Sequence, residues 1–250
     1  MKKSWLLSGL LLLPTMASAS VLWKGDFETG NASQWSKEES VSSNRLLVEA
    51  NRVREGTYAL RVQVNQGDKP IQASGNRNEL VYVDDTLMDG RGEGAERYYS
   101  WSTLFDESYP SENTWQVFSQ WHHTGLNGSP PMEFYVMGEE MRMRVGGERA
   151  QDVWKAPLQR GVWNDFVVHV KWSADPNVGF VALYHNGQQV VAPTPMATLY
   201  PGQGVYVKQG LYRNSTIAPE GVLFHDGFTV ATDLADVLPA AATTASAGVY

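Results

Sequence analysis

The chain is organised around the stretch Tyr206-Val207-Lys208-Gln209-Gly210-Leu211-Tyr212-Arg213-Asn214. In a β-strand, successive side chains point to opposite faces. One face of this strand therefore carries Tyr206, Lys208, Gly210 and Tyr212, which is an unusual set for a packed sheet. We interpret this face as a ligand-binding surface, on which the glycine leaves room for a ligand to approach. The alternative is an ordinary sheet surface, because tyrosine is favoured in strands.

The rest of the chain predicts an all-β fold. Short apolar or alternating runs are separated by Gly, Asn, Asp and Pro, and no long segment has a helical period. So many short strands indicate a jelly-roll sandwich of two antiparallel sheets with a concave substrate groove. The hairpin turn at Asn186-Gly187 is the clearest local signal, because both residues tolerate positive φ. The expected strands are Leu46–Val48, Ala59–Val64, Glu79–Val83, Arg97–Phe105, Trp115–His122, Met132–Met137, Met141–Val145, Trp163–Trp172, Val178–Tyr184, Gln188–Val191, Val205–Tyr212 and Gly221–Val230.

The two ends of the chain differ from the rest in composition. Residues 1–19 have a basic start, the apolar run Leu6 to Leu13 and the small residues Ala17-Ser18-Ala19, which together indicate a secretory signal peptide. The apolar run is shorter than the about 20 residues that a spanning helix needs. We therefore expect an exported protein, periplasmic or extracellular, with one domain over residues 20–238. Residues 239–250 are rich in Ala, Thr and Ser and are expected to form a flexible tail.

Charge and cysteine content narrow the range of partners. The 250 residues include 20 basic and 27 acidic side chains, a formal net charge of −7, and no cysteine. Without the predicted signal peptide, 18 basic residues remain and the net charge is −9. A chain this acidic has no general attraction for nucleic acid or anionic membranes, so cations that bind an anionic ligand must be gathered locally. We expect a monomer without disulfides or thiolate metal sites.

Alternation along two further strands separates core residues from surface cations. Phe166, Val168, Val170 and Trp172 form an apolar set that should face the core, with His169 on the opposite face. Similarly, Arg142 and Arg144 lie opposite three apolar residues of the strand Met141–Val145. These charged faces are either solvated or part of a concave sheet that binds an anionic chain. We assign His169 and Arg144 to substrate binding on the second interpretation.

Two other stretches place polar side chains on one strand face. Gln120 and His122 lie two residues apart on the same face, with Val117 and Trp121 expected in the core on the other. Upstream, Arg77 and Glu79 share a face and can pair, and a guanidinium also offers a planar fork to a carboxylate. Asn76 and Asn78 could add amide donors. Each stretch alone is equally compatible with a structural role.

Taken in order, three motifs change this assessment. Arg-Asn-Glu-Leu at 77–80, Gln-Trp-His at 120–122 and Tyr-Val-Lys-Gln-Gly-Leu-Tyr at 206–212 resemble the signature strands of jelly-roll polysaccharide lyases. The chain most resembles the heparin lyase I and glucuronan lyase group, and its motifs are similar to those of jelly-roll alginate lyases. The resemblance extends to Gly25–Gly30, Trp163–Ser173 and His225-Asp226-Gly227. It is specific for the reaction and not for the sugar.

The resemblance implies β-elimination at a uronic acid, in which a base removes the C5 proton and the oxygen at C4 departs. Such a site must neutralise the carboxylate and protonate the leaving oxygen. The implied catalytic residues are Arg77 and Gln120 for neutralisation, His122 as base and Tyr212 as acid, or as both base and acid. The remaining residues assigned to substrate binding are Asn76, Asn78, Lys208, Tyr206, Arg144, His169 and Arg213.

No cofactor is required by this chemistry, but the resemblance also implies a structural calcium ion. Glu28 and Asp226 are the oxygen ligands we assign to it, because hard cations prefer carboxylates. Both residues could equally serve as turn residues.

Two other functions compete with the lyase. A glycoside hydrolase needs two positioned carboxylic acids, and Glu133, Glu139 and Glu140 have the wrong spacing or lie in a turn. A non-catalytic lectin or carbohydrate-binding module would use exposed aromatic residues but would not require His122 and Tyr212 to converge. The small number of basic residues favours an unsulfated polyuronate, glucuronan or alginate-like, over a heavily sulfated chain.

Overall fold

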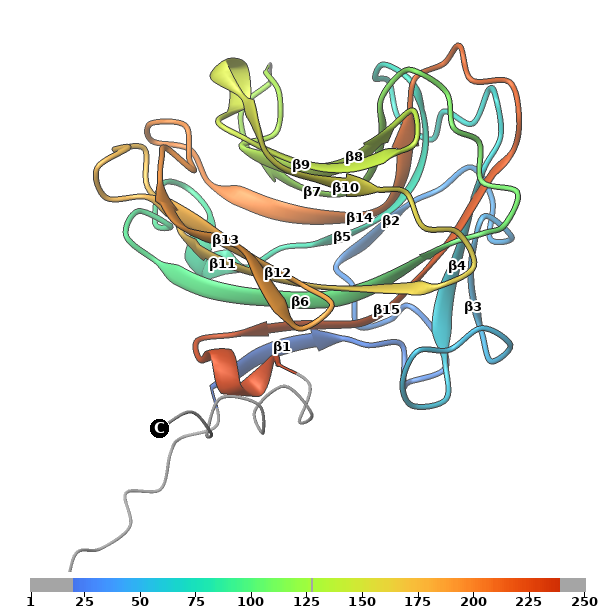
Figure 1. Cartoon of the computed structure of the whole chain (residues 1–250), viewed down its shortest axis with the longest axis horizontal. Coiled ribbons are helices and arrows are strands. Elements are labelled where there is room, and N and C mark those ends of the chain that lie inside the picture. Colours follow the sequence, from blue (N-terminus) through green and yellow to red (C-terminus); the bar gives the residue numbers. More distant parts are fainter. Residues whose placement is uncertain (1–19, 127, 239–250) are drawn as a thin grey trace, which may run out of the picture.

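Two antiparallel sheets stack face to face, and the upper one in Figure 1 is curved. The computed structural model describes residues 20–126 and 128–238. The predicted signal peptide and C-terminal tail lie outside the described residues. Within those ranges no helix is long and apolar enough to span a membrane.

The lower sheet has eight strands in the order β13-β12-β11-β6-β15-β4-β3, and β1 pairs with β15 as well. Its strands are β1 (Val21–Gly25), β3 (Leu46–Glu49), β4 (Ala59–Val64), β6 (Glu96–Phe105), β11 (Trp163–Lys171), β12 (Phe180–His185), β13 (Gln188–Pro195) and β15 (Gly221–Ala231).

The upper sheet has seven strands in the order β10-β9-β8-β7-β14-β5-β2. They are β2 (Lys37–Glu39), β5 (Asn76–Tyr82), β7 (Gln116–His123), β8 (Met132–Met137), β9 (Glu140–Val145), β10 (Gln151–Pro157) and β14 (Val205–Arg213). Three short 3₁₀ helices complete the described elements: η1 (Asp85–Leu87), η2 (Gly147–Arg149) and η3 (Leu234–Asp236).

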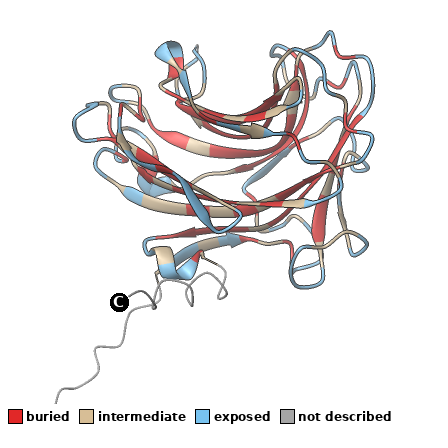
Figure 2. Ribbon diagram, viewed as in Figure 1, coloured by how far each residue is buried: buried red, intermediate tan, exposed pale blue. Residues whose placement is uncertain are grey.

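The hydrophobic core lies between the sheets, where buried residues follow the strands in Figure 2. The predicted inward set Phe166, Val168, Val170 and Trp172 belongs to this core. Asn186 and Gly187 have φ of 50° and 76° and join β12 to β13, which confirms the predicted hairpin. The all-β sandwich is therefore confirmed, and the alternation of apolar residues is its cause.

The alternation of side chains between the two faces is interrupted at one point of β7. The pairing of β7 with β8 shifts register between Val117 and Ser119, as does its pairing with β14 between Gln209 and Tyr212. Because an extra residue at a β-bulge reverses the faces beyond it, Phe118 packs in the core while Val117 lines the groove. The prediction that Val117 faces the core is wrong, whereas Trp121 is in the core as predicted.

Three strands, β1, β2 and β10, have no counterpart among the predicted ones. Strand β2 is only Lys-Glu-Glu, which has no apolar residue to mark it. Its pairing with β5 nevertheless brings Glu39 opposite Glu79 at the edge of the seven-stranded sheet. This placement gives the short strand a role in the site.

Candidate active site

A groove of about 520 Å³ lies on the face of the seven-stranded sheet that points away from the core. Strands β2, β5, β7, β8, β9 and β14 all contribute side chains to it. Its polar and aromatic lining residues are Glu39, Ser74, Arg77, Trp115, Gln120, His122, Ser129, Glu133, Arg144, Tyr206, Lys208 and Tyr212. The three motifs of the sequence therefore meet in one groove.

Strand register explains this convergence. Strand β14 lies between β7 and β5, and its Tyr206 and Lys208 are opposite His122 and Gln120 of β7. On its other side, Tyr212 is opposite Arg77 of β5. Side chains directly opposite each other in an antiparallel pair have Cβ atoms about 5 Å apart. Two distant segments are thereby aligned along a single central strand.

Arg77 is held rigidly at one end of the cluster. Its Nη1 donates to Glu79 Oε2 at 3.2 Å, and its Nη2 donates to the Ser74 carbonyl at 3.0 Å. The guanidinium carbon lies 3.6 Å from the centroid of the Tyr212 ring. The side chain is only 7% exposed. The cation is thus pre-positioned, so little reorganisation is needed when a charge develops beside it.

Glu79 connects three groups of the groove from beneath. Its Oε1 accepts from Gln120 Nε2 at 2.5 Å, and its Oε2 lies 3.8 Å from Lys208 Nζ. Together with the bond from Arg77, these contacts fix the donors that line the groove. The Arg77–Glu79 pair expected from the sequence is present, and its function is to orient neighbouring side chains.

Lys208 is paired with a residue that the sequence did not indicate. Its Nζ donates to Glu39 Oε2 at 2.6 Å, and the two side chains are 4% and 8% exposed. Lys37 also contacts Glu39, at 2.8 Å. Burial alone would raise the pKa of Glu39, but the hydrogen bonds from both lysines lower it overall. Lys208 lines the groove as an ion pair rather than as a free cation.

Within the described residues, His122 has hydrogen-bond partners at Nδ1 and none at Nε2. Its Nδ1 lies 2.8 Å from the His123 carbonyl and 3.4 Å from the Tyr206 hydroxyl. The carbonyl requires a proton on Nδ1, so Nε2 carries the lone pair. Burial lowers the pKa of His122, mainly by disfavouring the imidazolium. The ring is therefore neutral at neutral pH and can accept a proton.

Two phenols line the groove in different surroundings. Tyr212 OH is 2.6 Å from Ser74 Oγ, and its ring lies 4.6 Å from Trp115. Tyr206 is beside His122, and burial raises the pKa of Tyr206 to about 12. The phenol nearest His122 is therefore Tyr206, while Tyr212 lies at the Arg77 end of the same groove.

Glycine is needed at position 210 for a different reason from the one expected from the sequence. Its φ is 157°, and a Cβ there would lie 2.3 Å from the Asn78 carbonyl. Its own carbonyl accepts from His225 Nε2 at 3.0 Å. The glycine is required by the close approach of β5 at the irregular pairing, whether or not a ligand binds above it.

Four residues assigned to substrate binding lie outside the groove, which corrects that assignment. Asn76, Asn78 and Arg213 are fully buried on the opposite face of the same sheet, because they alternate with Arg77 and Tyr212. His169 belongs to β11 of the other sheet, where its ring stacks on Tyr98 and bonds to Glu96 at 2.6 Å. The alternation of side chains along a strand separates its two faces, but it does not indicate which of the two sheets forms the groove.

The two residues proposed for calcium serve a loop instead. Glu28 accepts from the backbone N–H groups of Thr57 and Tyr58, and Asp226 Oδ2 accepts from those of Arg54 and Glu55. N–H donors oppose a cation, and the described residues contain no group of three or more His, Asp or Glu suited to a metal. These contacts do not favour a calcium ion at either carboxylate, and the calcium assignment stays a prediction.

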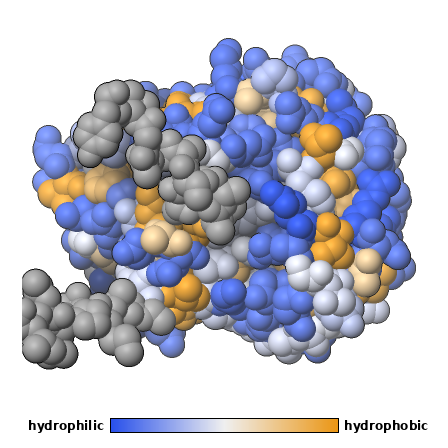
Figure 3. All heavy atoms as spheres, turned by 60° about the horizontal axis from the view of Figure 1, so that its bottom comes forward, coloured by the Kyte–Doolittle hydropathy of each residue, from blue (hydrophilic) through white to orange (hydrophobic). Residues whose placement is uncertain are grey.

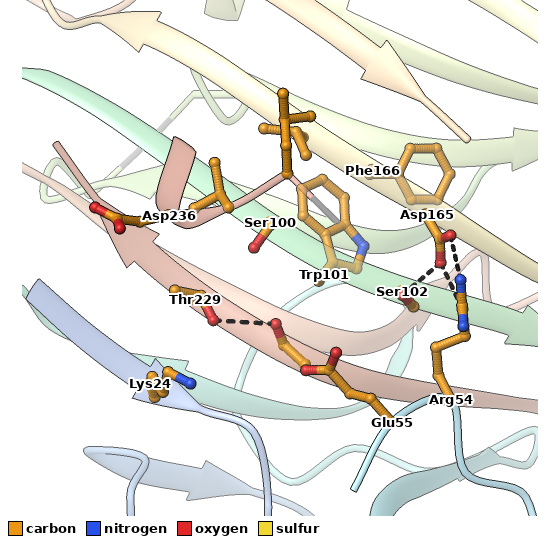
Figure 4. A pocket seen from close by; sticks show the side chains of 14 residues that line it. Lys24, Arg54, Glu55, Ser100, Trp101, Ser102, Asp165, Phe166, Thr229 and Asp236 are labelled. Atoms are coloured by element: carbon orange, nitrogen blue, oxygen red, sulfur yellow. Dashed lines mark hydrogen bonds and ion pairs between the residues drawn. The ribbon is translucent and has the colours of Figure 1, made fainter. Parts of the chain in front are cut away.

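A second pocket, of about 290 Å³, lies on the outer face of the eight-stranded sheet. Figure 4 shows Arg54 and Asp165 facing each other there, with bonds of 2.9 and 2.8 Å. Ser102 Oγ also donates to Asp165 at 2.7 Å. This side of the molecule is largely hydrophilic in Figure 3. Because Arg54 and Asp165 satisfy each other there, whereas the three sequence motifs meet in the larger groove, we place the active site in that groove.

The sequence matches the polysaccharide lyase family over residues 27–229. The chain belongs to this family. It is therefore a polysaccharide lyase, as the three motifs suggested. No curated protein has a matching sequence.

Solved structures share the fold of this lyase at low sequence identity. An endo-β-1,4-glucuronan lyase from the fungus Trichoderma reesei has a TM-score of 0.73 and 19% identity, covering 88% of this chain and 99% of that one. An alginate lyase from Pseudomonas aeruginosa has a TM-score of 0.54 and 16% identity, covering 77% and 87%. A GH131 β-glucanase catalytic domain from Podospora anserina has a TM-score of 0.63 and 14% identity, covering 86% and 96%.

The sequence did not indicate several residues of this lyase that contact the predicted ones, among them Ser74, Glu39 and Trp115. Ser74 and Glu39 come from a loop and a short polar strand, and neither carries a local signal. Trp115 lies directly before β7 and packs on Tyr212. Only their tertiary contacts identify them.

Proposed function

We propose that this polysaccharide lyase is exported and cleaves an unsulfated polyuronate, glucuronan or alginate-like, by β-elimination. The observation that carries the proposal is that Arg77 and Gln120, both bound to Glu79, line one groove together with His122 and Tyr212. Export rests on the composition of residues 1–19. The structural similarity to a glucuronan lyase and an alginate lyase supports this choice of substrate.

The reaction needs three tasks, and the groove offers a group for each. The C5–H bond of the uronate breaks, its electron pair forms the C4=C5 double bond, and the C4–O bond breaks. Arg77 and the second N–H of Gln120 stabilise the negative charge that develops on the carboxylate. His122 Nε2 takes the C5 proton, because its Nδ1 proton is directed to a backbone carbonyl.

Tyr212 donates a proton to the departing C4 oxygen. Its hydroxyl is held by Ser74, and its ring is fixed between Trp115 and the Arg77 guanidinium. Tyr206 instead supports His122 and stays protonated because of its raised pKa. The two tyrosines therefore have separate roles, with Tyr212 as the acid and Tyr206 as a residue that positions the base.

Absorbance in the ultraviolet tests the reaction type, because β-elimination creates an unsaturated uronyl end. We expect the wild-type protein to produce this absorbance from at least one member of a polyuronate panel. His122→Ala and Tyr212→Phe should each abolish it in a folded protein, and Arg77→Ala should lower kcat about 10²-fold or more by analogy with the loss of an oxyanion donor. The matched control, Tyr206→Phe, should retain more activity than Tyr212→Phe. Full turnover by Tyr212→Phe would remove the assigned acid.

The same assay tests a second candidate, a glycoside hydrolase. The GH131 β-glucanase shares the fold, and the carboxyl group of Glu133 lines this groove while that of Glu79 lies beneath it. A hydrolase would release reducing ends without an increase in ultraviolet absorbance. A lectin would produce neither reducing ends nor absorbance. Glu79 is 2% exposed and bound by Arg77 and Gln120, so we place the lyase first.

A further inference from the structure

Glu133 is an acidic residue of the groove with no role in the elimination described above. It lies in β8, opposite Gln120 of β7 on one side and Arg144 of β9 on the other. The residue is 9% exposed and lines the groove. Its neighbours Met132 and Phe134 point into the core, so the carboxyl group points to the substrate side.

This carboxyl group lacks the partners that hold the other two acids of the groove. Glu39 is bound by Lys208 and Lys37, and Glu79 by Arg77 and Gln120. Among residues 20–126 and 128–238, by contrast, no hydrogen bond to the Glu133 side chain is formed. Arg144 Nη1 is 3.6 Å away, beyond good hydrogen-bond distance.

Arg144 gives its hydrogen bonds to other groups. Its Nε donates to Asp152 Oδ1 at 3.2 Å, and its Nη2 donates to Tyr135 OH at 2.6 Å. Nearby, the side-chain oxygen of Gln120 is buried and has no donor within the described residues. Glu133 thus lies among polar atoms that a sugar hydroxyl could satisfy.

The charge of Glu133 decides the balance of the groove. Three cations line it, and three carboxylates face or underlie them: Arg77, Arg144 and Lys208 against Glu39, Glu79 and Glu133. With every group ionised, this cluster has no net charge to attract a polyanion. With Glu133 neutral, the cluster carries a net positive charge and attracts a uronate chain.

We propose that Glu133, together with Arg144, forms a sugar subsite beside the catalytic residues and determines substrate specificity there. The carboxyl group of Glu133 exchanges a hydrogen bond with a hydroxyl group of the sugar, and in its ionised form it repels a sulfate at that position. This inference rests on the proposed function and defines the substrate more narrowly: a uronate polymer with a free hydroxyl at this subsite.

Protonation of Glu133 near neutrality supports this role. Burial is the main cause that raises the pKa of Glu133 to about 7, and the charge of Asp152 adds to it, while Arg144 opposes it. The ionised form therefore accumulates as the pH rises above about 7. Binding of a uronate chain should weaken over the same range.

Six side chains surround Glu133 on its own strand and on the neighbouring strands. They are His122 and Gln120 of β7, Tyr135 of β8, Arg142 and Arg144 of β9 and Asp152 of β10. Burial lowers the pKa of His122, so its ring is already neutral there. For Asp152, burial would raise the pKa, but hydrogen bonds from Tyr135 and Arg144 lower it overall. Glu133 is thus the group to which we assign the pH dependence of binding around pH 7.

The test compares Glu133→Gln with Glu140→Gln, a charge-matched control on β9 that does not line the groove. The KM of each variant is measured from pH 6 to 8 with polyglucuronate and with chemically sulfated polyglucuronate. For the wild type and Glu140→Gln, we expect the KM for polyglucuronate to rise about tenfold, the effect of one unit of pH-dependent interaction. For Glu133→Gln, KM should stay flat, and the preference for the unsulfated polymer should fall.

Binding to the inactive His122→Ala protein separates the two proposals. Tryptophan fluorescence measures the Kd of polyglucuronate with and without the Glu133→Gln change, and needs no turnover. A Kd that weakens with pH only when Glu133 is present supports the subsite, even if β-elimination fails. If the Kd of Glu133→Gln keeps the pH dependence of the protein with Glu133, the subsite proposal is overturned. Glu133→Ala replaces Glu133→Gln in this test if the latter does not fold. An unchanged preference for the unsulfated polymer overturns the specificity role.

Discussion

The buried pair between Glu39 and Lys208 allows a prediction about stability as well as catalysis. Its two side chains are 8% and 4% exposed, and their charged atoms are 2.6 Å apart. Glu39→Gln removes the anion and leaves Lys208 buried, with Glu79 Oε2 still 3.8 Å away. Breaking a buried pair by removing one partner costs about 3–5 kcal/mol, because a buried charge is left without compensation.

We expect the lower end of this range, about 3 kcal/mol, because Glu79 remains near Lys208. In a domain of this size, such a loss corresponds to a fall in Tm of about 6–12 °C. Urea unfolding followed by tryptophan fluorescence measures the change in the free energy of unfolding. The matched control is Glu38→Gln, an exposed residue of the same strand, which should change that free energy by less than about 0.5 kcal/mol.

A double variant tests whether the unpaired buried cation causes the loss of stability. Glu39→Gln with Lys208→Met removes both charges, and should be more stable than Glu39→Gln alone because no buried cation remains. If Glu39→Gln loses no more stability than Glu38→Gln, or if the double variant is the least stable of the three, the pair is not the buried contact described.

Two further predictions concern turnover and acid stability. Ser74→Ala should lower kcat about tenfold with little change in KM, because the hydroxyl that orients Tyr212 is lost. The control is the kinetics of Ser129→Ala, which changes another serine of the groove. Equal effects of the two substitutions on kcat would contradict a specific role for Ser74. Burial lowers the pKa of His225 to about 4, so the unfolded chain binds a proton that the folded one does not between pH 6.5 and 4. The free energy of unfolding should fall by up to about 3 kcal/mol as pH drops through this range, and urea titrations should show a flatter dependence in His225→Gln; the same slope in both proteins would contradict this assignment.

Most of the fold could be predicted from the sequence, because alternation of apolar residues is a local property of a strand. The core set of β11 and the Asn186-Gly187 hairpin are as predicted. The prediction failed where local alternation does not apply. The irregular pairing of β7 turned Val117 toward the groove, and the polar strand β2 gave no apolar signal at all.

The sequence by itself determined the candidate groups of the site, since motifs along three strands indicated His122, Arg77 and Tyr212. Only the tertiary structure decided which groups meet. The register of β14 aligned the motifs, while Asn76, Asn78 and Arg213 turned away from the groove and His169 joined the other sheet. Glu39 reached Lys208 from 169 residues away. The physical reason is that a side chain's face follows from its neighbours in the chain, but its partners depend on strand pairing between segments far apart in sequence.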